Sequence, residues 1–116
     1  MGVEINTRAL TVSGKKLFAQ EDKKEIGRVY VYFLSNDLHH EPFAFIEDVF
    51  VEEDHRGRGV GSELVNRAVE EAKEKGCYKV VMTARTENKG VHTLYSKAGF
   101  SEHGKEFRMD LSCFLR

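Results

Sequence analysis

The stretch that decides the fold covers residues 50–62 and reads FVEEDHRGRGVGS. It begins with the apolar end of a strand, passes through a loop rich in glycine and arginine, and at Ser62 enters a run with helical periodicity. The first backbone N–H groups of a helix lack internal partners and carry partial positive charge. Glycines let an anion approach such groups, because no Cβ intervenes. The stretch therefore predicts a phosphate-binding loop formed by Arg56, Gly57, Arg58, Gly59, Val60, Gly61 and Ser62.

Two common phosphate motifs do not fit this loop. A P-loop needs a lysine directly before its last Ser or Thr, and the residue before Ser62 is Gly61. A dinucleotide fingerprint spaces its glycines as Gly-x-Gly-x-x-Gly, whereas here every second residue from 57 to 61 is glycine. The remaining alternative to a ligand loop is a glycine-rich turn that only caps an ordinary helix.

Downstream of the loop, the spacing of apolar residues predicts two helices and two strands. Residues 62–75 place Leu, Val and Ala on one helical face, and Gly76 stands where a left-handed residue ends a helix. Residues 78–84 form an apolar run suited to a buried strand. Residues 88–98 repeat the helical spacing, and residues 107–111 predict a last strand.

The segment before the loop has the character of strands and turns. Strands are predicted at 3–12, 17–19, 26–34 and 43–51, separated by turns at 14–16, 20–25 and 35–37. The order of elements predicts an α+β or α/β fold, with a mixed sheet and helices packed on it. The strand, helix and strand over residues 43–84 should form a parallel, right-handed unit.

Composition bounds the function. A chain of 116 residues fits one domain, so we expect residues 1–116 to form a single domain. The net charge of −1 does not favour a nucleic-acid partner. Cys77 and Cys113 form no metal-ligand pair, and so open a cysteine pattern favours a reducing cytoplasm. The first residues do not resemble a signal peptide, and no segment approaches the ~20 apolar residues of a membrane span, so no membrane partner is expected. The five histidines lack the spacing of a metal site, so no bound metal is expected.

Two motifs carry a resemblance to a known family. The pattern Arg-x-x-Gly-x-Gly, which starts at Arg56 after a strand ending in Val51, resembles the pyrophosphate loop of the GNAT superfamily of N-acetyltransferases. Downstream, Asn88 precedes Tyr95-x-Lys-x-Gly-Phe100, which is similar to the second signature of that family. The resemblance covers residues 43–111 and implies an enzyme that moves an acetyl group from acetyl-CoA directly to a primary amine.

One subfamily is more similar still. Residues 46–51, leading without a gap into the loop, and residues 76–81 resemble glucosamine-6-phosphate N-acetyltransferases. The chain departs from that subfamily at Thr83, where the subfamily has Asp, and in a longer segment over residues 84–91. It also shows no helical pattern before Ser62, so the fold is expected to lack the usual N-terminal helices of the superfamily.

The resemblance and the local pattern together assign candidate roles. Glu47 is expected on the same side of its strand as several apolar residues, where burial would raise its pKa towards that of a general base. The alternative is that Glu47 lies on an exposed edge or in a structural ion pair. Asp48 should point to the opposite face. By resemblance, Tyr95 protonates the departing thiolate, unless it is a core tyrosine. Asn88 binds the pantetheine arm or caps its helix. The backbone of Phe50 and Val51 should pair with the pantetheine amides.

Three functions remain open at this stage. The first is acetylation of a small amine, with glucosamine 6-phosphate as first guess and Arg85, Lys89 and Lys97 as candidate phosphate contacts. The second is a protein or peptide N-acetyltransferase, and the third is an acyl-CoA-binding domain without catalysis. Missing acceptor-side helices would leave apolar sheet surface uncovered, so a homodimer is also predicted.

Overall fold

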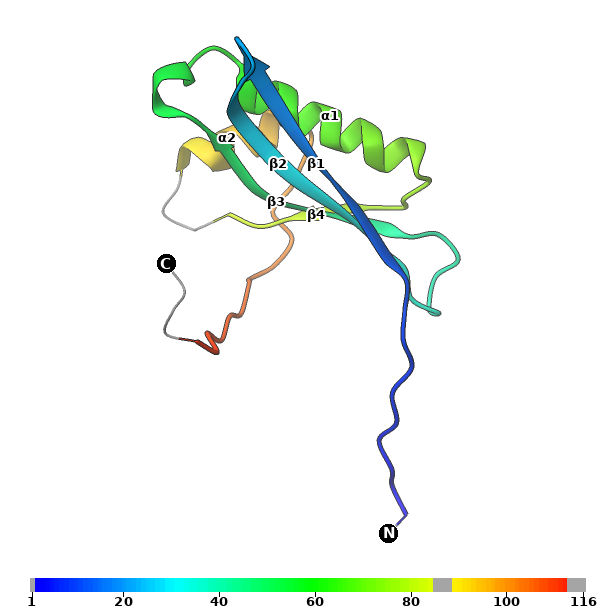
Figure 1. Ribbon diagram of the computed structural model, residues 1–116. Helices are drawn as coiled ribbons and strands as arrows, with labels where there is room; N and C mark the ends of the chain where they lie inside the picture. The colour runs from blue at the N-terminus through cyan, green and yellow to red at the C-terminus, as the bar shows by residue number, and fades with distance from the viewer. Residues whose placement is uncertain (1, 85–88, 113–116) are drawn as a thin grey trace. The chain divides into compact units, whose positions relative to one another are not determined.

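A computed structural model describes residues 2–84 and 89–112 of the chain (Figure 1). These residues group into two compact units, one up to Met82 and one from Thr83 onward. The prediction of a single domain stays a prediction.

The first unit is built on a mixed four-stranded sheet (Figure 1). Its strands are β1 (Val12–Glu21), β2 (Lys24–Leu34), β3 (Phe43–Val51) and β4 (Val80–Met82), in the spatial order β1-β2-β3-β4. The first three strands are antiparallel, and β4 is parallel to β3. The chain between β3 and β4 contains η1 (Glu53–His55) and α1 (Val60–Glu74). The predicted mixed sheet and the parallel strand-helix-strand unit are confirmed.

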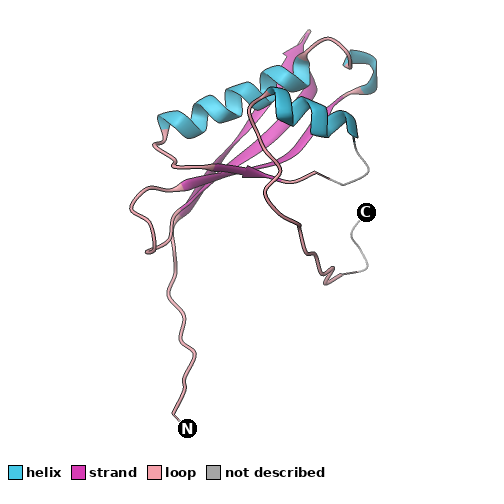
Figure 2. Ribbon diagram, turned by 180° about the vertical axis from the view of Figure 1, so that it is seen from behind, coloured by secondary structure: helices cyan, strands magenta, loops and turns pink. Residues whose placement is uncertain are grey.

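Helix α1 covers one face of the sheet, as Figure 2 shows. It contacts β1, β2 and β3, and it ends before Gly76, whose φ of 81° confirms the predicted left-handed terminator. The fully buried core side chains alternate along β2 and β3 and recur at helical spacing on α1. They are Val29, Val31, Ala44, Ile46, Val65, Ala68 and Ala72.

The hairpin between β1 and β2 confirms one predicted turn and corrects another. Asp22 and Lys23 both have positive φ, 53° and 65°, as a two-residue type I′ hairpin turn requires. The turn predicted at residues 14–16 is wrong, because β1 runs straight through Gly14, which pairs with Tyr32. A Cβ at Gly14 would lie 2.9 Å from the carbonyl oxygen of Val31, so glycine permits close strand approach there.

Two predicted strands are absent from the structure. Residues 3–11 form no strand and are exposed, with Val3 and Ile5 each 93% exposed. Residues 107–111 are also outside any strand, and Phe107 is 92% exposed. Apolar, β-branched residues form a strand only where a partner strand satisfies their backbone groups, and neither segment pairs.

The second unit contains α2 (Lys89–Lys97), close to the helix predicted over residues 88–98. It ends before Gly99, whose φ is 103°. The backbone N–H of Phe100 returns to the carbonyl of Tyr95 at 3.0 Å, and the two rings lie 6.1 Å apart. The end of this helix is therefore closed by a glycine turn that brings Phe100 back against Tyr95.

Candidate active site

Strand β3 contains a bulge at the position where its pairing with β4 stops. Arg28 of β2 pairs with Phe50 and Tyr30 pairs with Glu47, so two residues of β3 oppose the single residue Val29. Asp48 sits in the bulge with a φ of 59°. Pairing with β4 ends at Ile46, just before this bulge. Among the described residues of the first unit, β3 from Glu47 onward thus has no strand partner on its β4 side.

This open edge includes Phe50 and Val51, whose backbone was predicted to pair with pantetheine amides. The side chain of Arg56 approaches the same edge, because its Nε donates a hydrogen bond to the Val51 carbonyl at 2.8 Å. Its guanidinium also lies 5.6 Å from the centre of the Phe50 ring. The carbonyl of Val51 keeps a second lone pair for another donor. The arrangement is compatible with sheet-like binding of a ligand amide, which stays a prediction.

The predicted phosphate loop joins η1 to α1. Gly57 and Gly59 have φ values of 81° and 83°, and a Cβ at either position would meet no atom within 4 Å. Glycine is therefore required by the backbone conformation of this loop, and not by crowding. Gly59 is the N-cap residue of α1 and supplies no side-chain cap.

The first turn of α1 leaves backbone donors available. Its first helical hydrogen bond runs from the N–H of Glu63 to the carbonyl of Gly59, at 3.0 Å. The N–H groups of Val60, Gly61 and Ser62 precede that bond and have no acceptor within the helix. Three donors at the positive end of a 15-residue helix, next to a loop without side-chain obstruction, can bind an anion such as a pyrophosphate.

The second arginine of the loop is held by the β1–β2 hairpin. The Nη2 of Arg58 donates to Glu21 Oε2 at 2.8 Å, and His55 Nε2 lies 3.0 Å from Glu21 Oε1. Hydrogen bonds from Arg58 and His55 hold the pKa of the Glu21 carboxyl below its ordinary value. The hydrogen bond to Glu21 and the negative charge of its carboxylate in turn raise the pKa of Arg58. Sequence reasoning did not identify Glu21, because its partners lie 34 and 37 positions away.

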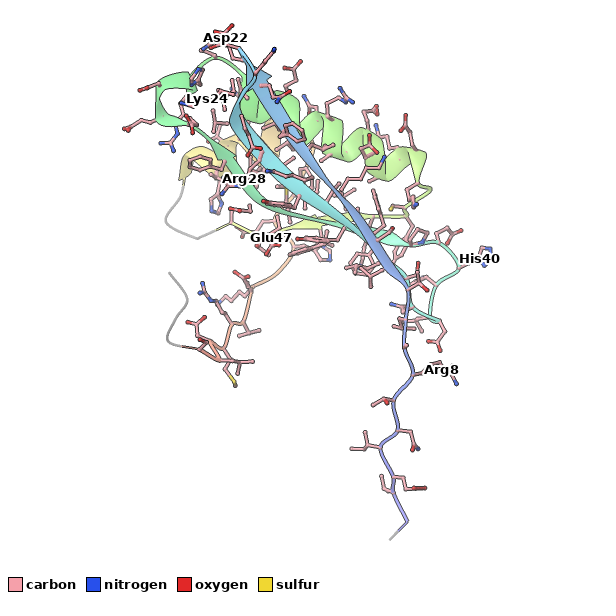
Figure 3. The ribbon with its side chains drawn as sticks, in the orientation of Figure 1. Arg8, Asp22, Lys24, Arg28, His40 and Glu47 are labelled. Carbon is pink, nitrogen blue, oxygen red and sulfur yellow. The ribbon has the colours of Figure 1, made fainter. Side chains whose placement is uncertain are left out.

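The structure corrects the expectation for Glu47. Its side chain is exposed, so the predicted burial is absent. It lies on the face of β3 opposite Ala44 and Ile46, which face α1, and α1 therefore cannot bury it. Figure 3 shows Glu47 on the sheet with Arg28 on the neighbouring strand. Glu47 is thus an accessible carboxylate at the end of the β3–β4 pairing, and its role as a base stays a prediction.

Asp48 does not point away from this face as predicted. Its Oδ2 lies 3.2 Å from Nη2 of Arg28, whose neighbour Val29 is buried on the α1 side. Arg28 thus belongs to the face that also carries Tyr30 and Glu47. The left-handed residue in the bulge breaks the two-residue alternation on which the prediction depended.

Two tyrosines accompany Glu47 on this face. Tyr30 is its cross-strand partner, and Tyr32 lies two residues further along β2, opposite Phe45. Burial and the negative charge of Glu47 raise the pKa of Tyr32. The alternation of β2 could have placed Tyr30 and Tyr32 on one face, but only the register with β3 shows which carboxylate they accompany.

Tyr95 belongs to the second unit and lies on α2. Its side chain is half-buried, and burial raises the pKa of its hydroxyl. A tyrosine hydroxyl is protonated at neutral pH even without such a shift. A protonated phenol is the form that a general acid needs. Lys97 is exposed on the same helix. Asn88 and Arg85 lie outside the described residues, as does the side chain of Lys89.

The described ranges contain neither a metal-site cluster nor a membrane-spanning helix. Across residues 2–84 and 89–112, no group of three or more His, Cys, Asp or Glu side chains gathers as a metal site would require. No helix of the same ranges is long and apolar enough to cross a bilayer.

Comparison with known proteins places this geometry in a family. A sequence model of the acetyltransferase (GNAT) family matches residues 5–100. That range includes the bulged strand, the glycine loop and both helices. The family match thus covers most of the chain.

Individual relatives match a shorter region. A probable glucosamine 6-phosphate N-acetyltransferase of Oryza sativa subsp. japonica is 48% identical over 59 residues, 51% of this chain and 34% of the relative. An N-alpha-acetyltransferase of Arabidopsis thaliana is 43% identical over 56 residues, 48% of this chain and 30% of the relative. The crystal structure of glucosamine-6-phosphate N-acetyltransferase from Arabidopsis thaliana superposes with a TM-score of 0.73 at 27% identity, over 80% of this chain and 65% of that one. The chain thus matches about a third of the length of these two sequence relatives.

Proposed function

Because the chain belongs to the acetyltransferase (GNAT) family, we propose that it transfers an acetyl group from acetyl-CoA to a primary amine, as an acyltransferase of class EC 2.3.1. The observation that carries the proposal is the loop from Arg56 to Ser62. Two left-handed glycines expose the first N–H groups of α1 beside an open strand edge. This arrangement fits a pyrophosphate joined to an amide-containing arm, which are the parts of coenzyme A that a protein must hold.

The chain supplies three groups to the proposed reaction. Acetyl-CoA itself brings an activated thioester. The N–H groups of Val60, Gly61 and Ser62 bind the diphosphate and fix the position of the ligand. As the acceptor nitrogen bonds to the acetyl carbon and the carbon–sulfur bond breaks, Glu47 accepts a proton from nitrogen. Tyr95 donates its hydroxyl proton to sulfur.

The Glu47→Gln variant should lose most activity at low pH. There the amine is almost entirely protonated and a base is most needed, so we expect a loss of about 10²-fold, shrinking as the pH rises towards the pKa of the free amine. The measurement is a pH–rate profile of acetyl transfer under kcat/KM conditions. Asp48→Asn is the matched control, since it removes the neighbouring charge while keeping Glu47. Superimposable profiles for Glu47→Gln and wild type would remove Glu47 from the mechanism.

For the acceptor, we propose a phosphorylated amino sugar, with glucosamine 6-phosphate as first candidate. Support comes from the two glucosamine-6-phosphate N-acetyltransferases described above. The N-alpha-acetyltransferase among the relatives keeps a peptide acceptor as the second candidate. A domain that binds acetyl-CoA without transferring the acetyl group is the third.

An amine panel separates the three candidates. Glucosamine 6-phosphate should be acetylated at least about tenfold more efficiently than glucosamine, because a charge-assisted phosphate contact contributes ~1.5–3 kcal/mol. Free thiol release from acetyl-CoA is the readout for each amine. Equal rates for the two sugars, or transfer only to peptides, would reject the sugar-phosphate acceptor and leave acetyl transfer intact. Acetyl-CoA binding without thiol release from any amine would instead support the non-catalytic domain.

The homodimer also stays a proposal. Its support is the edge strand β1, where Phe18 is 51% exposed on a strand that pairs with β2 alone among the described residues. Light scattering that gives the mass of a monomer at micromolar concentration, in an active sample, would contradict it.

A further inference from the structure

The tip of the β1–β2 hairpin lies against the loop that follows β3. Asp22 and Lys23 form the turn, and the flanking pair, Glu21 and Lys24, both reach the loop region. Lys24 Nζ lies 3.6 Å from Glu52 Oε1, and Figure 3 shows Asp22 and Lys24 at this end of the sheet. The neighbouring backbone is joined too, because the N–H of Glu52 donates to Ile26 at 2.8 Å. The hairpin tip therefore contacts the start of the loop through both side chains and backbone.

Glu21 contacts the loop at two points. One carboxylate oxygen accepts from Arg58, two residues before α1, and the other accepts from His55, at the end of η1. A carboxylate only accepts, so Nε2 of His55 carries the hydrogen of that bond. The side chain of His55 is 17% exposed, and its Nδ1 is buried without a hydrogen-bond partner among the described residues. Glu21 is thus the partner that the structure shows for the polar edge of this imidazole.

We infer that Glu21 is a positioning residue for the phosphate loop, and that Arg58 serves the loop through Glu21 instead of contacting the phosphate. The two contacts span Gly57, a residue that leaves the loop little intrinsic stiffness. Fixing the chain on both sides of that glycine favours the conformation in which Gly59 starts α1. The inference rests on the proposed acetyl-CoA site and assigns Arg58 a role there.

The two arginines of the loop differ in this respect. Arg58 directs its Nη2 at the Glu21 carboxylate, whose negative charge offsets the attraction of this guanidinium for a phosphate. Arg56 uses its Nε for the Val51 carbonyl, which leaves its two Nη nitrogens for a ligand. We therefore expect Arg56 to contact the phosphate directly and Arg58 to hold the loop in its binding conformation.

A double-mutant cycle on acetyl-CoA binding tests this division. Isothermal titration is applied to wild type, Glu21→Gln, Arg58→Gln and the double variant. Each single variant should weaken binding by about fivefold, the scale of a modest exposed ion-pair network. The double variant should be no weaker than Glu21→Gln alone, because that change already removes the contact with Arg58. The salt dependence of the dissociation constant should be the same in Arg58→Gln and wild type, since no ligand contact is lost.

Glu25→Gln is the matched control for charge. Glu25 lies in the same hairpin, and its carboxylate pairs with Lys16 of β1 at 2.8 Å instead of with the loop. Its substitution should leave the dissociation constant unchanged or slightly lower. Because loss of a nearby negative charge alone would tighten anion binding, weakening in Glu21→Gln but not in Glu25→Gln isolates the effect of positioning.

Other outcomes would overturn the inference. Additive losses with a reduced salt dependence in Arg58→Gln would mean that Arg58 contacts the phosphate directly. Unchanged or tighter binding in Glu21→Gln would mean that Glu21 does not position the phosphate loop. If Glu21→Gln fails to fold, Glu21→Asp, which is one methylene shorter, replaces it with the same expectation. Wild-type protein that does not bind acetyl-CoA would reject the proposed function itself. This result differs from failure of the positioning inference, in which the wild type binds acetyl-CoA and only the pattern among the variants departs from the expected one.

Discussion

The Gly59→Val variant is expected to fold and to lose measurable binding of acetyl-CoA. Gly59 has a φ of 83°, a conformation that a β-branched residue adopts only at a cost of roughly 1–3 kcal/mol. A Cβ there would meet no atom within 4 Å, so the core would not be disturbed. The loop would instead change its backbone conformation and turn the N–H groups of Val60, Gly61 and Ser62 away from the diphosphate. Binding is measured by isothermal titration and folding by circular dichroism.

Gly76→Val is the matched control for this variant. Gly76 terminates the same helix at its other end, has a φ of 81°, and also has open space where a Cβ would lie. Both substitutions should therefore lower the melting temperature by similar amounts, and only Gly59→Val should abolish binding. Wild-type affinity in folded Gly59→Val protein would reject the loop as the diphosphate site.

The Tyr95→Phe variant should bind acetyl-CoA normally and slow acetyl transfer by about 10²–10⁴-fold, or roughly 3–5 kcal/mol of transition-state stabilisation. Phenylalanine keeps the ring that lies beside Phe100 and removes only the hydroxyl. Single-turnover kinetics with saturating acetyl-CoA measures the transfer step.

Tyr78→Phe provides the control for loss of a tyrosine hydroxyl. Tyr78 is 41% exposed, and its ring packs 4.4 Å from that of His39, in the first unit. This variant should transfer acetyl groups at the wild-type rate. A wild-type transfer rate in Tyr95→Phe, with chemistry shown to limit turnover, would make Tyr95 a packing residue.

The parts of the fold that were predictable from sequence are those fixed by local spacing. The apolar spacing of α1 predicts its buried face, and Gly76 marks its end, because a left-handed terminator needs no distant partner. The alternation of β2 likewise predicts Val29, Val31 and Phe33 on the core side. The glycine loop was predictable because positive φ values have a direct residue signature in Gly57 and Gly59.

The remaining features depend on contacts between distant residues. Gly14 has the local signature of a turn, but it lies in β1 opposite Tyr32, where the Val31 carbonyl leaves no room for a Cβ. Asp48 has no pattern that marks a bulge, and the bulge decides which face it shares with Glu47. Residues 107–111 have strand composition without a strand to pair with. Partner strands, bulges and long-range ion pairs such as Glu21 with Arg58 are set by the fold, so local sequence does not reveal them.

The most direct test of the central claim is a titration of the isotopically labelled 116-residue chain with acetyl-CoA, followed by amide chemical shifts. The account predicts the largest shift changes at the backbone N–H groups of Val60, Gly61 and Ser62, because these donors meet the diphosphate, and smaller changes at the neighbouring Gly57 and Gly59. Coenzyme A should reproduce those changes, and acetate should not. Saturable binding with unchanged loop amides, or no binding at millimolar acetyl-CoA, would contradict the account.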